Sequence, residues 1–294
     1  MGKRTRGQQI FAVFNALLMV LIIITCLLPL INVLAVSFSR QEAVAAGEVS
    51  LLPVGFTTVA YTTILKDRLF LRTFGNSLLR LLAGVPINLF LAITAAYPLS
   101  KNGNKLAFRQ GYVWFFVTTM LVGGGLIPTY LTIRALGLLG SFWALLLPGA
   151  VSAYNMILLL NFFKTIPSEL EEAALIDGAG HWRILWGLYV PCSLPAIATL
   201  TLFFVVGHWN EWFSAQIYLN RTEQYPLQSY LQVLLTQSKN TQNLSLKELE
   251  ELAKVNNRTF NSAQIVLSTL PVLLVYPFLQ RYFVTGLTLG SVKG

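Results

Sequence analysis

The chain of 294 residues is 55% hydrophobic and only 11% charged, well below the roughly one quarter of charged residues that is usual in soluble globular domains. Its formal net charge is +9, but the basic residues are scattered at the ends of apolar stretches and form no stripe along one face, which argues against nucleic-acid binding. This composition excludes an ordinary soluble domain and indicates a membrane protein. Cys26 and Cys192 lie in or beside apolar stretches, so we interpret them as small buried apolar residues and not as a disulfide framework or metal site.

Several stretches are long enough to span a bilayer, which takes roughly 20 mostly apolar residues. In chain order they are about 10–36, 74–99, 112–133, 142–163, 192–213 and 264–285. The first follows a basic start, as in a signal peptide, but its apolar run exceeds the roughly 7 to 15 residues of such a peptide's core. We therefore expect a retained helix. Prolines inside the spans are tolerated in membrane bundles.

The orientation of the spans follows from the basic residues beside them, because such residues accumulate in cytoplasmic loops. They gather before the first span and between the second and third, at Lys3, Arg4, Arg6, Lys101, Lys105 and Arg109. The sequence therefore predicts an all-α membrane protein of six transmembrane helices with cytoplasmic N and C termini.

This topology divides the chain into three parts. A cytoplasmic N-terminus (1–9) precedes a six-helix domain (10–285) and a cytoplasmic tail (286–294). Within the helical domain, we expect extracytoplasmic loops at about 37–72 and 214–263, and a cytoplasmic loop at about 164–191.

The cytoplasmic loop contains the segment ELEEAALIDGAG, residues 169–180, which has the composition of a soluble surface helix. Ser168 with Glu171 three residues later forms a capping-box pattern, which predicts that a helix begins here. Gly178 and Gly180 are expected to end it, since glycine adopts the left-handed conformation without steric cost. From these features alone, an ordinary connector between two spans is an equally good interpretation.

The spacing of this segment points to a family. The letters E-A-A at 172–174, G at 178 and L-x-V-P at 188–191 closely resemble the EAA motif of the membrane subunits of binding-protein-dependent ABC importers. That motif reads Glu-Ala-Ala, three residues, Gly, nine residues, Ile-x-Leu-Pro. The departures at Leu188 and Val190 stay among aliphatic residues.

Three further segments resemble the carbohydrate branch of that family, the maltose-type and complex-sugar permeases. They are GEVSLLPVGFTTVAY at 47–61, HWNEWF at 208–213 and GLTLGSVKG at 286–294. The resemblance therefore extends along nearly the whole chain and implies the type I ABC importer permease fold. It implies a function as well: a pathway for an oligosaccharide or polysaccharide fragment, acidic or neutral.

The resemblance also implies roles for individual residues. In this family the EAA helix docks in a cleft of a separate ATPase subunit, so Glu172 would make charged contacts and Gly178 would permit a bend. Ala173 and Ala174 would allow close approach. The residues expected to couple to the ATPase are Glu169, Glu172, Ala173, Ala174, Asp177, Gly178 and Pro191. The tail residues expected to reach the ATPase pair are Gly290, Val292, Lys293 and Gly294.

The phosphate-binding motif G-x-x-x-x-G-K-[ST] does not occur in the sequence, so we expect no enzymatic activity and no bound cofactor in this chain. The glycines at 123–125 lie in an apolar span and indicate close packing or a helix break. By resemblance, ATP and Mg belong to two partner ATP-binding subunits. The other expected partners are a second permease subunit in a heterodimer, an extracytoplasmic sugar-binding protein and membrane lipid, in the cytoplasmic membrane of a bacterium.

Ionisable residues inside spans are candidates for the transport pathway. Arg80 and Arg281 lie toward span ends and are expected to snorkel or to pair. His208 and Glu211 are three residues apart and share a helix face. The candidate pathway residues are His208, Trp209, Asn210, Glu211 and Trp212. Two interpretations stay open: these residues line the sugar pathway, or Glu211 is bonded internally while the tryptophans belong to the interfacial aromatic belt.

Two other classes of function are alternatives to an importer permease. An ion-coupled secondary sugar transporter would use Glu211 and His208 as its proton pair. An intramembrane enzyme has no support, because no H-E-x-x-H motif occurs in the sequence.

Overall fold

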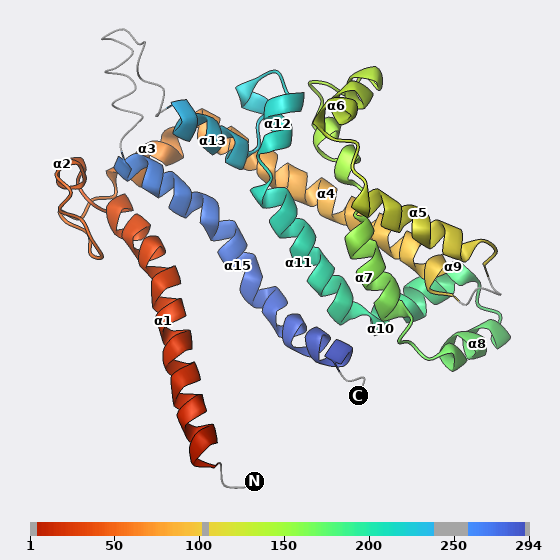
Figure 1. Ribbon diagram of the computed structural model, residues 1–294. Coiled ribbons are helices and arrows are strands. Elements are labelled where there is room, and N and C mark those ends of the chain that lie inside the picture. The colour runs from red at the N-terminus through yellow and green to blue at the C-terminus, as the bar shows by residue number, and fades with distance from the viewer. Residues whose placement is uncertain (1–4, 102–105, 238–257, 292–294) are drawn as a thin grey trace. The chain divides into compact units, whose positions relative to one another are not determined.

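The computed structural model describes residues 5–101, 106–237 and 258–291, and all regular structure within these ranges is helical. The chain divides into two compact units. Unit 1 comprises Met1–Arg68 and Val233–Leu270, and unit 2 comprises Leu69–Gln232 and Pro271–Gly294 (Figure 1).

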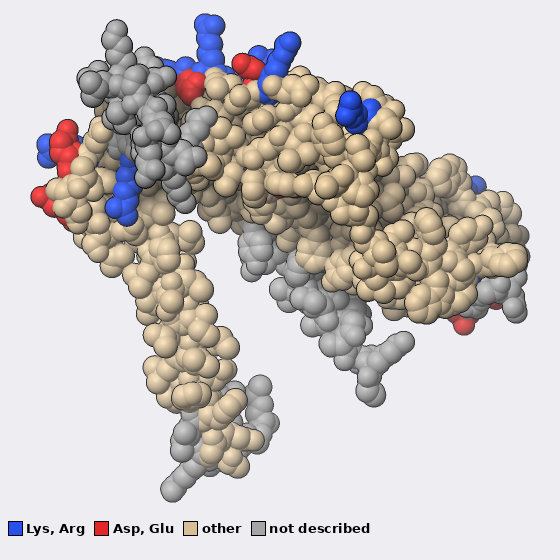
Figure 2. Space-filling model, turned by 45° about the horizontal axis from the view of Figure 1, so that its top comes forward, with Lys and Arg blue, Asp and Glu red and all other residues tan. Residues whose placement is uncertain are grey.

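Unit 1 is built around a long apolar helix. It contains α1 (Arg6–Ser37), α2 (Gln41–Ala45), α3 (Val59–Lys66) and the first part of α15 (Arg258–Ser291). The start of α1 is fixed by Thr5, whose hydroxyl accepts the N–H of Gln8, while the Gln8 side chain accepts the N–H of Thr5. This reciprocal pair is a capping box. The described side chains of α1 carry no charge, as Figure 2 shows, and none of its most apolar stretch is buried.

Unit 2 contains most of the remaining helices. In chain order they are α4 (Arg68–Ser100), α5 (Arg109–Leu121), α6 (Leu126–Ala135), η1 (Phe142–Leu145), η2 (Leu147–Gly149), α7 (Ala153–Phe163), α8 (Ser168–Ile176), α9 (His181–Ile184), the π-helical turn η3 (Leu185–Tyr189), α10 (Val190–Cys192), α11 (Leu194–Asn210), α12 (Phe213–Tyr218) and η4 (Thr222–Gln224). Helix α13 (Leu227–Gln237) begins in this unit. Figure 1 shows α8, α9 and α10 at one end of the unit and α6 and α12 at the other.

The predicted spans appear as continuous or broken helices. Gly7–Ser37 and Arg68–Ser100 are each long and apolar enough to cross a membrane. The third and fourth predicted spans are bent helix pairs, with angles of 113° and 47°. The fifth corresponds to α11, which forms a further bent pair, at 83°, with the preceding segment His181–Cys192. Counting each bent pair as one span gives up to five over the described residues. The predicted span 264–285 lies within α15, and six spans in total stay a prediction.

The break in the third span occurs where the glycines were expected to cause it. Helix α5 ends at Leu121, and α6 begins after Gly125, whose φ is 81°. This positive φ is accessible to glycine at little cost but is unfavourable for residues with a Cβ. The interpretation of this segment as a helix break is therefore confirmed.

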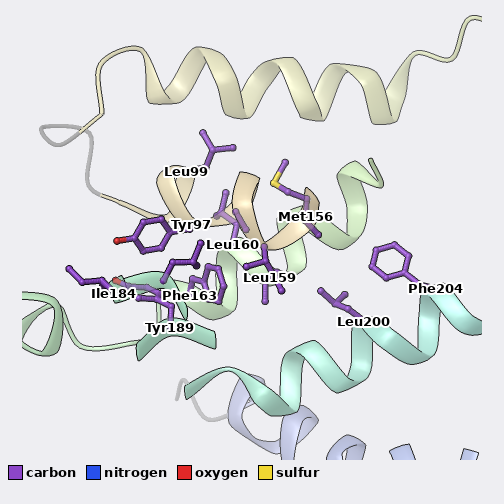
Figure 3. Close-up of a cluster of buried hydrophobic side chains, with 14 of the residues drawn as sticks. Tyr97, Leu99, Met156, Leu159, Leu160, Phe163, Ile184, Tyr189, Leu200 and Phe204 are labelled. Carbon is purple, nitrogen blue, oxygen red and sulfur yellow. The ribbon is translucent and has the colours of Figure 1, made fainter. Parts of the chain in front are cut away.

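The core of unit 2 is an apolar cluster contributed by α4, α7, α11 and the segment α9–η3 (Figure 3). Its members include Ala92, Ala96, Tyr97, Met156, Leu159, Phe163, Ile184, Tyr189, Leu200 and Phe204. Lipid tails are as apolar as these side chains, so close packing of small residues and polar contacts, more than hydrophobicity, must select how the helices meet. Ala92 and Ala96 provide such small contacts on one face of α4.

One expectation about the apolar spans is wrong. Cys26 and Cys192 are exposed in the isolated chain and not buried. An apolar sequence predicts removal from water, and a surface that faces lipid or another subunit satisfies that requirement as well as a protein core does.

Candidate functional site

Helix α8 begins differently from the sequence prediction. Its N-cap is Pro167, and no side chain makes a capping hydrogen bond. The prediction of a capping box formed by Ser168 and Glu171 is therefore wrong. The helix starts one residue early, and Pro167 offers neither a side-chain oxygen nor an N–H for the reciprocal pair. Glu171 is instead buried.

The end of α8 is a Schellman motif. The N–H of Gly178 donates to the carbonyl of Leu175 over 3.0 Å, and the N–H of Ala179 donates to that of Ala174 over 2.9 Å. Gly178 has φ 77°, which confirms the left-handed ending. Gly180 has φ −72° and serves as the N-cap of α9, so the same expectation is wrong for Gly180.

Most of the residues expected to couple to the ATPase are exposed, on α8 or in the chain that follows it. Glu169, Glu172, Ala173, Asp177 and Gly178 are exposed, as is Pro191 in α10. Ala174 is half-buried and packs against the core cluster. Apolar side chains lie among the acidic ones: Leu170, Leu175 and Ile176 are exposed, Ile176 by 86%. An exposed apolar surface bordered by charge is the usual composition of a protein-binding face.

The inner side of α8 carries a buried ion pair that the sequence did not reveal. Glu171 Oε2 lies 2.8 Å from Lys101 Nζ and accepts the hydroxyl proton of Tyr189 over 2.9 Å. The Lys101 ammonium lies over two aromatic rings, 3.9 Å from the centroid of Tyr97 and 3.8 Å from that of Tyr189. The sequence held one signal for this contact: Tyr97 and Lys101 are four residues apart and would therefore lie on the same face of a helix.

A polar cavity of about 780 Å³ adjoins this pair. It is lined by residues of four segments of the chain, among them Lys101, Arg109, Lys164, Glu169 and Tyr189. Arg109 donates its Nε–H to the carbonyl of Leu99 near the end of α4 over 2.7 Å. Burial and the nearby charge of Arg109 lower the pKa of Lys164. The charged side chains of the cavity wall are thus of both signs: Lys101, Arg109 and Lys164 are basic, and Glu169 and Glu171 are acidic.

A second, smaller cavity of about 320 Å³ lies between α4, α7 and α11 within unit 2. Its polar lining comprises Arg80, Asn88, Ser152, Asn155, His208, Glu211, Ser214 and Tyr218. It therefore includes two of the five candidate pathway residues, His208 and Glu211.

Glu211 is held by two neighbours at the point where α11 ends. Its Oε2 lies 2.8 Å from Arg80 Nη2, and its Oε1 accepts the N–H of Ser214 over 2.8 Å. Arg80 also donates to the backbone carbonyls of Glu211 and Leu145. Arg80 is thus paired, as its position in the span led us to expect.

His208 has a partner of its own on α4. Its Nε2 lies 2.6 Å from Asn88 Oδ1. Asn88 Nδ2 donates to the carbonyls of Gly149 and Ala150, so its oxygen must be the acceptor and His208 must carry its proton on Nε2. The structure therefore gives His208 and Glu211 separate partners.

The other candidate pathway residues point to different surroundings. Trp209 is 2% exposed and packs edge-on against Phe74, with ring centroids 5.9 Å apart. Asn210 and Trp212 are exposed. Of the tail residues, Gly290 belongs to α15, whereas Val292, Lys293 and Gly294 lie outside the described residues. Among the described residues, no His, Cys, Asp and Glu side chains gather in a group that could hold a metal ion.

A family model described as "Binding-protein-dependent transport system inner membrane component" matches residues 111–288, which include the EAA segment. The chain belongs to this family. The permease is 41% identical to the polygalacturonan/rhamnogalacturonan transport system permease protein YtcP of Bacillus subtilis, over 96% of this chain and 97% of the relative. It is 38% identical to Protein LplC of the same organism, over 99% of this chain and 97% of that protein.

A solved structure is similar over nearly the whole length. It is a chain of a bacterial ABC transporter involved in the import of the acidic polysaccharide alginate, with 35% identity and a TM-score of 0.86. The similarity covers 96% of this permease and 100% of that chain. The all-α membrane fold of a type I ABC importer permease is thereby confirmed, as is the resemblance to carbohydrate importers. The permease is a transport subunit of the inner membrane and not an enzyme, and the comparisons give no support to a secondary transporter.

Proposed function

We propose that this permease pairs with a second, different permease to form the membrane pathway of an ATP-driven importer. The cargo is an oligosaccharide or polysaccharide fragment delivered by an extracytoplasmic binding protein. Support comes from the 41% identical relative, named for polygalacturonan and rhamnogalacturonan, and from the similar alginate importer chain. Polygalacturonan and alginate are both acidic polymers, so we propose a uronate-containing cargo.

The coupling role rests on one observation, the two-sided character of α8. Its outer face presents Glu169, Glu172 and Ala173 to solvent, while Glu171 is held inside. Such a face suits docking on a soluble ATPase: the carboxylates can pair with basic groups there, and Ala173 allows close approach. ATP and Mg would be bound by two such ATPase subunits, and the tail 290–294 would contact them.

The transport pathway is proposed to pass the cavity that contains His208 and Glu211. This cavity presents hydrogen-bonding groups of the kind that recognise sugar hydroxyls, including Asn88, Ser152 and Asn155. Its one arginine, Arg80, is neutralised by Glu211. Recognition of acidic groups would therefore depend on the binding protein or the partner permease, with this chain contributing hydroxyl contacts.

The proposal is tested with the full complex in proteoliposomes that contain ATP, with the binding protein outside. Oligogalacturonate and oligoalginate are expected to enter and to stimulate ATP hydrolysis, whereas maltodextrin of equal length is not. Uptake should persist with a protonophore. Uptake that requires a proton gradient and no ATP would contradict the importer, and equal stimulation by maltodextrin would contradict the acidic cargo.

A further inference from the structure

We infer that Lys101 and Glu171, held between Tyr97 and Tyr189, form the joint through which displacement of α8 is passed to α4. The inference rests on the proposed function in one respect only, that a partner ATPase moves α8. It assigns these four side chains as positioning residues for transport.

The joint connects three separate segments of unit 2. Tyr97 belongs to α4 and Lys101 follows its last residue, Glu171 belongs to α8, and Tyr189 belongs to the π-helical turn η3. The carboxylate of Glu171 receives both the Lys101 ammonium and the Tyr189 hydroxyl on the same oxygen, Oε2. Displacement of α8 would therefore pull on both α4 and η3 through the Glu171 carboxylate.

The aromatic rings fix the position of the ammonium. Tyr97 and Tyr189 pack edge to face, with ring centroids 5.0 Å apart, and Lys101 Nζ lies within 4 Å of both centroids. The Tyr97 hydroxyl in turn lies 3.1 Å from His181 Nδ1 of α9. A cation is attracted by the negative face of an aromatic ring, most strongly where it is shielded from water, so two rings hold Lys101 in one place.

Stability alone does not account for a pair of this kind. The two side chains are only 8% and 4% exposed, and replacing such a buried ion pair by well-packed apolar residues is often neutral or even stabilising. Separating the two charges, in contrast, costs free energy, because a buried ammonium and a buried carboxylate lose their mutual attraction where water cannot replace it. The pair therefore resists relative movement of α8 and α4 far more than an apolar contact would, because apolar surfaces can slide without losing directional bonds.

Beyond the joint, α4 leads toward the polar cavity. Asn88 lies nine residues before Tyr97 on the same helix, about 14 Å along its axis, and it bonds His208 of α11. Arg80, farther along α4, pairs with Glu211 at the end of α11. The helix α4, which is continuous through Pro86 and Pro98, thus links the coupling helix to the groups that line the cavity.

The test uses the whole reconstituted importer and measures two quantities, uptake and ATP hydrolysis, whose ratio reports coupling. The double variant Lys101→Met with Glu171→Leu replaces the pair by apolar side chains. We expect it to assemble with the ATPases and to hydrolyse ATP, but with uptake per ATP reduced about tenfold, the change that corresponds to roughly 1.4 kcal/mol.

A milder variant provides a second measurement. Tyr189→Phe removes only the hydroxyl that bonds Glu171 and should lower uptake per ATP severalfold, because the contact between η3 and α8 loses this directional bond. Tyr154→Phe is the matched control, because Tyr154 is an exposed tyrosine of α7, and its ratio should not change.

The outcomes separate the two proposals. If the wild-type complex fails to import sugar with ATP, the proposed function is wrong. If the wild-type complex imports but Tyr189→Phe and the double variant keep a ratio within about twofold of it, below about 0.5 kcal/mol, the joint is overturned. If the double variant does not assemble with the ATPases, the uptake-to-ATP ratio of Tyr189→Phe alone decides whether the joint exists.

Discussion

Gly84 of α4 lies directly against the imidazole of His208 of α11. A Cβ placed on Gly84 would be 2.6 Å from Nε2 and 2.8 Å from Cε1 of that ring. One turn farther along α4, Asn88 accepts the Nε2 proton. The absence of a side chain at position 84 is therefore what allows His208 to reach its partner on the neighbouring helix.

Gly84→Ala is expected to destabilise unit 2. The ring is held by Asn88 and has little freedom to withdraw, and inserting an extra carbon into a packed site typically costs about 1–3 kcal/mol. Thermal unfolding of the purified complex in detergent measures the change. Gly75→Ala is the matched control on the same helix, since nothing lies within 4 Å of its Cβ position. That variant should be neutral or slightly stabilising, because alanine favours a helix over glycine by about 1 kcal/mol, and equal losses for both would contradict the contact.

Arg80→Met is expected to cost about 2–3 kcal/mol of folding free energy. Removing one partner of a fully buried pair costs about 3–5 kcal/mol, and we discount this because Glu211 is 32% exposed. Adding Glu211→Gln to Arg80→Met should restore part of the loss, since the amide oxygen can still accept the Ser214 N–H. Chemical denaturation of the single and double variants gives the coupling energy. A double variant as unstable as the sum of the two single changes would show that the pair contributes no coupling.

Gly178→Ala is expected to weaken the end of α8. The residue has φ 77°, and a left-handed conformation costs a residue with a Cβ about 1–2 kcal/mol. Space is not the limit, because none of the described residues apart from the two chain neighbours has an atom within 4 Å of the Cβ position. Gly178→Asn should therefore recover much of the loss, since asparagine tolerates this conformation. Co-purification of the ATPase with each variant is the measurement, and equal behaviour of Ala and Asn would exclude the conformational explanation.

Glu172→Ala is expected to weaken co-purification with the ATPase while leaving the fold unchanged. The side chain is exposed on the outer face of α8, so its removal affects only a partner. Loss of one charged contact across an interface would lower affinity by about tenfold or more. Glu223→Ala is a suitable control, because Glu223 is also exposed but lies in η4. Unchanged co-purification of Glu172→Ala would remove this residue from the docking surface.

The helical elements could largely be predicted from the sequence. The apolar stretches at 10–36 and 74–99 correspond to α1 and α4 because the length of an apolar run is a local property. The break after α5 followed from the glycines at 123–125, and the end of α8 followed from Gly178. The start of α8 shows where prediction from consecutive residues fails. The helix begins one residue earlier than predicted, with Pro167 as its N-cap, so no capping box forms and Glu171 is a buried residue instead of a cap.

That this chain is a helical membrane permease, and where its EAA segment lies, could be inferred from the sequence, because the length of an apolar run and the EAA spacing are properties of consecutive residues. Which carboxylate of α8 is buried, and which partners His208 and Glu211 have, follows from the packing of helices that are distant in the sequence. Membrane helices are apolar on almost every face, so periodicity does not indicate which face meets protein and which meets lipid. The contacts of Glu171 with Lys101, and of Gly84 with His208, exist only because α4 passes both α8 and α11.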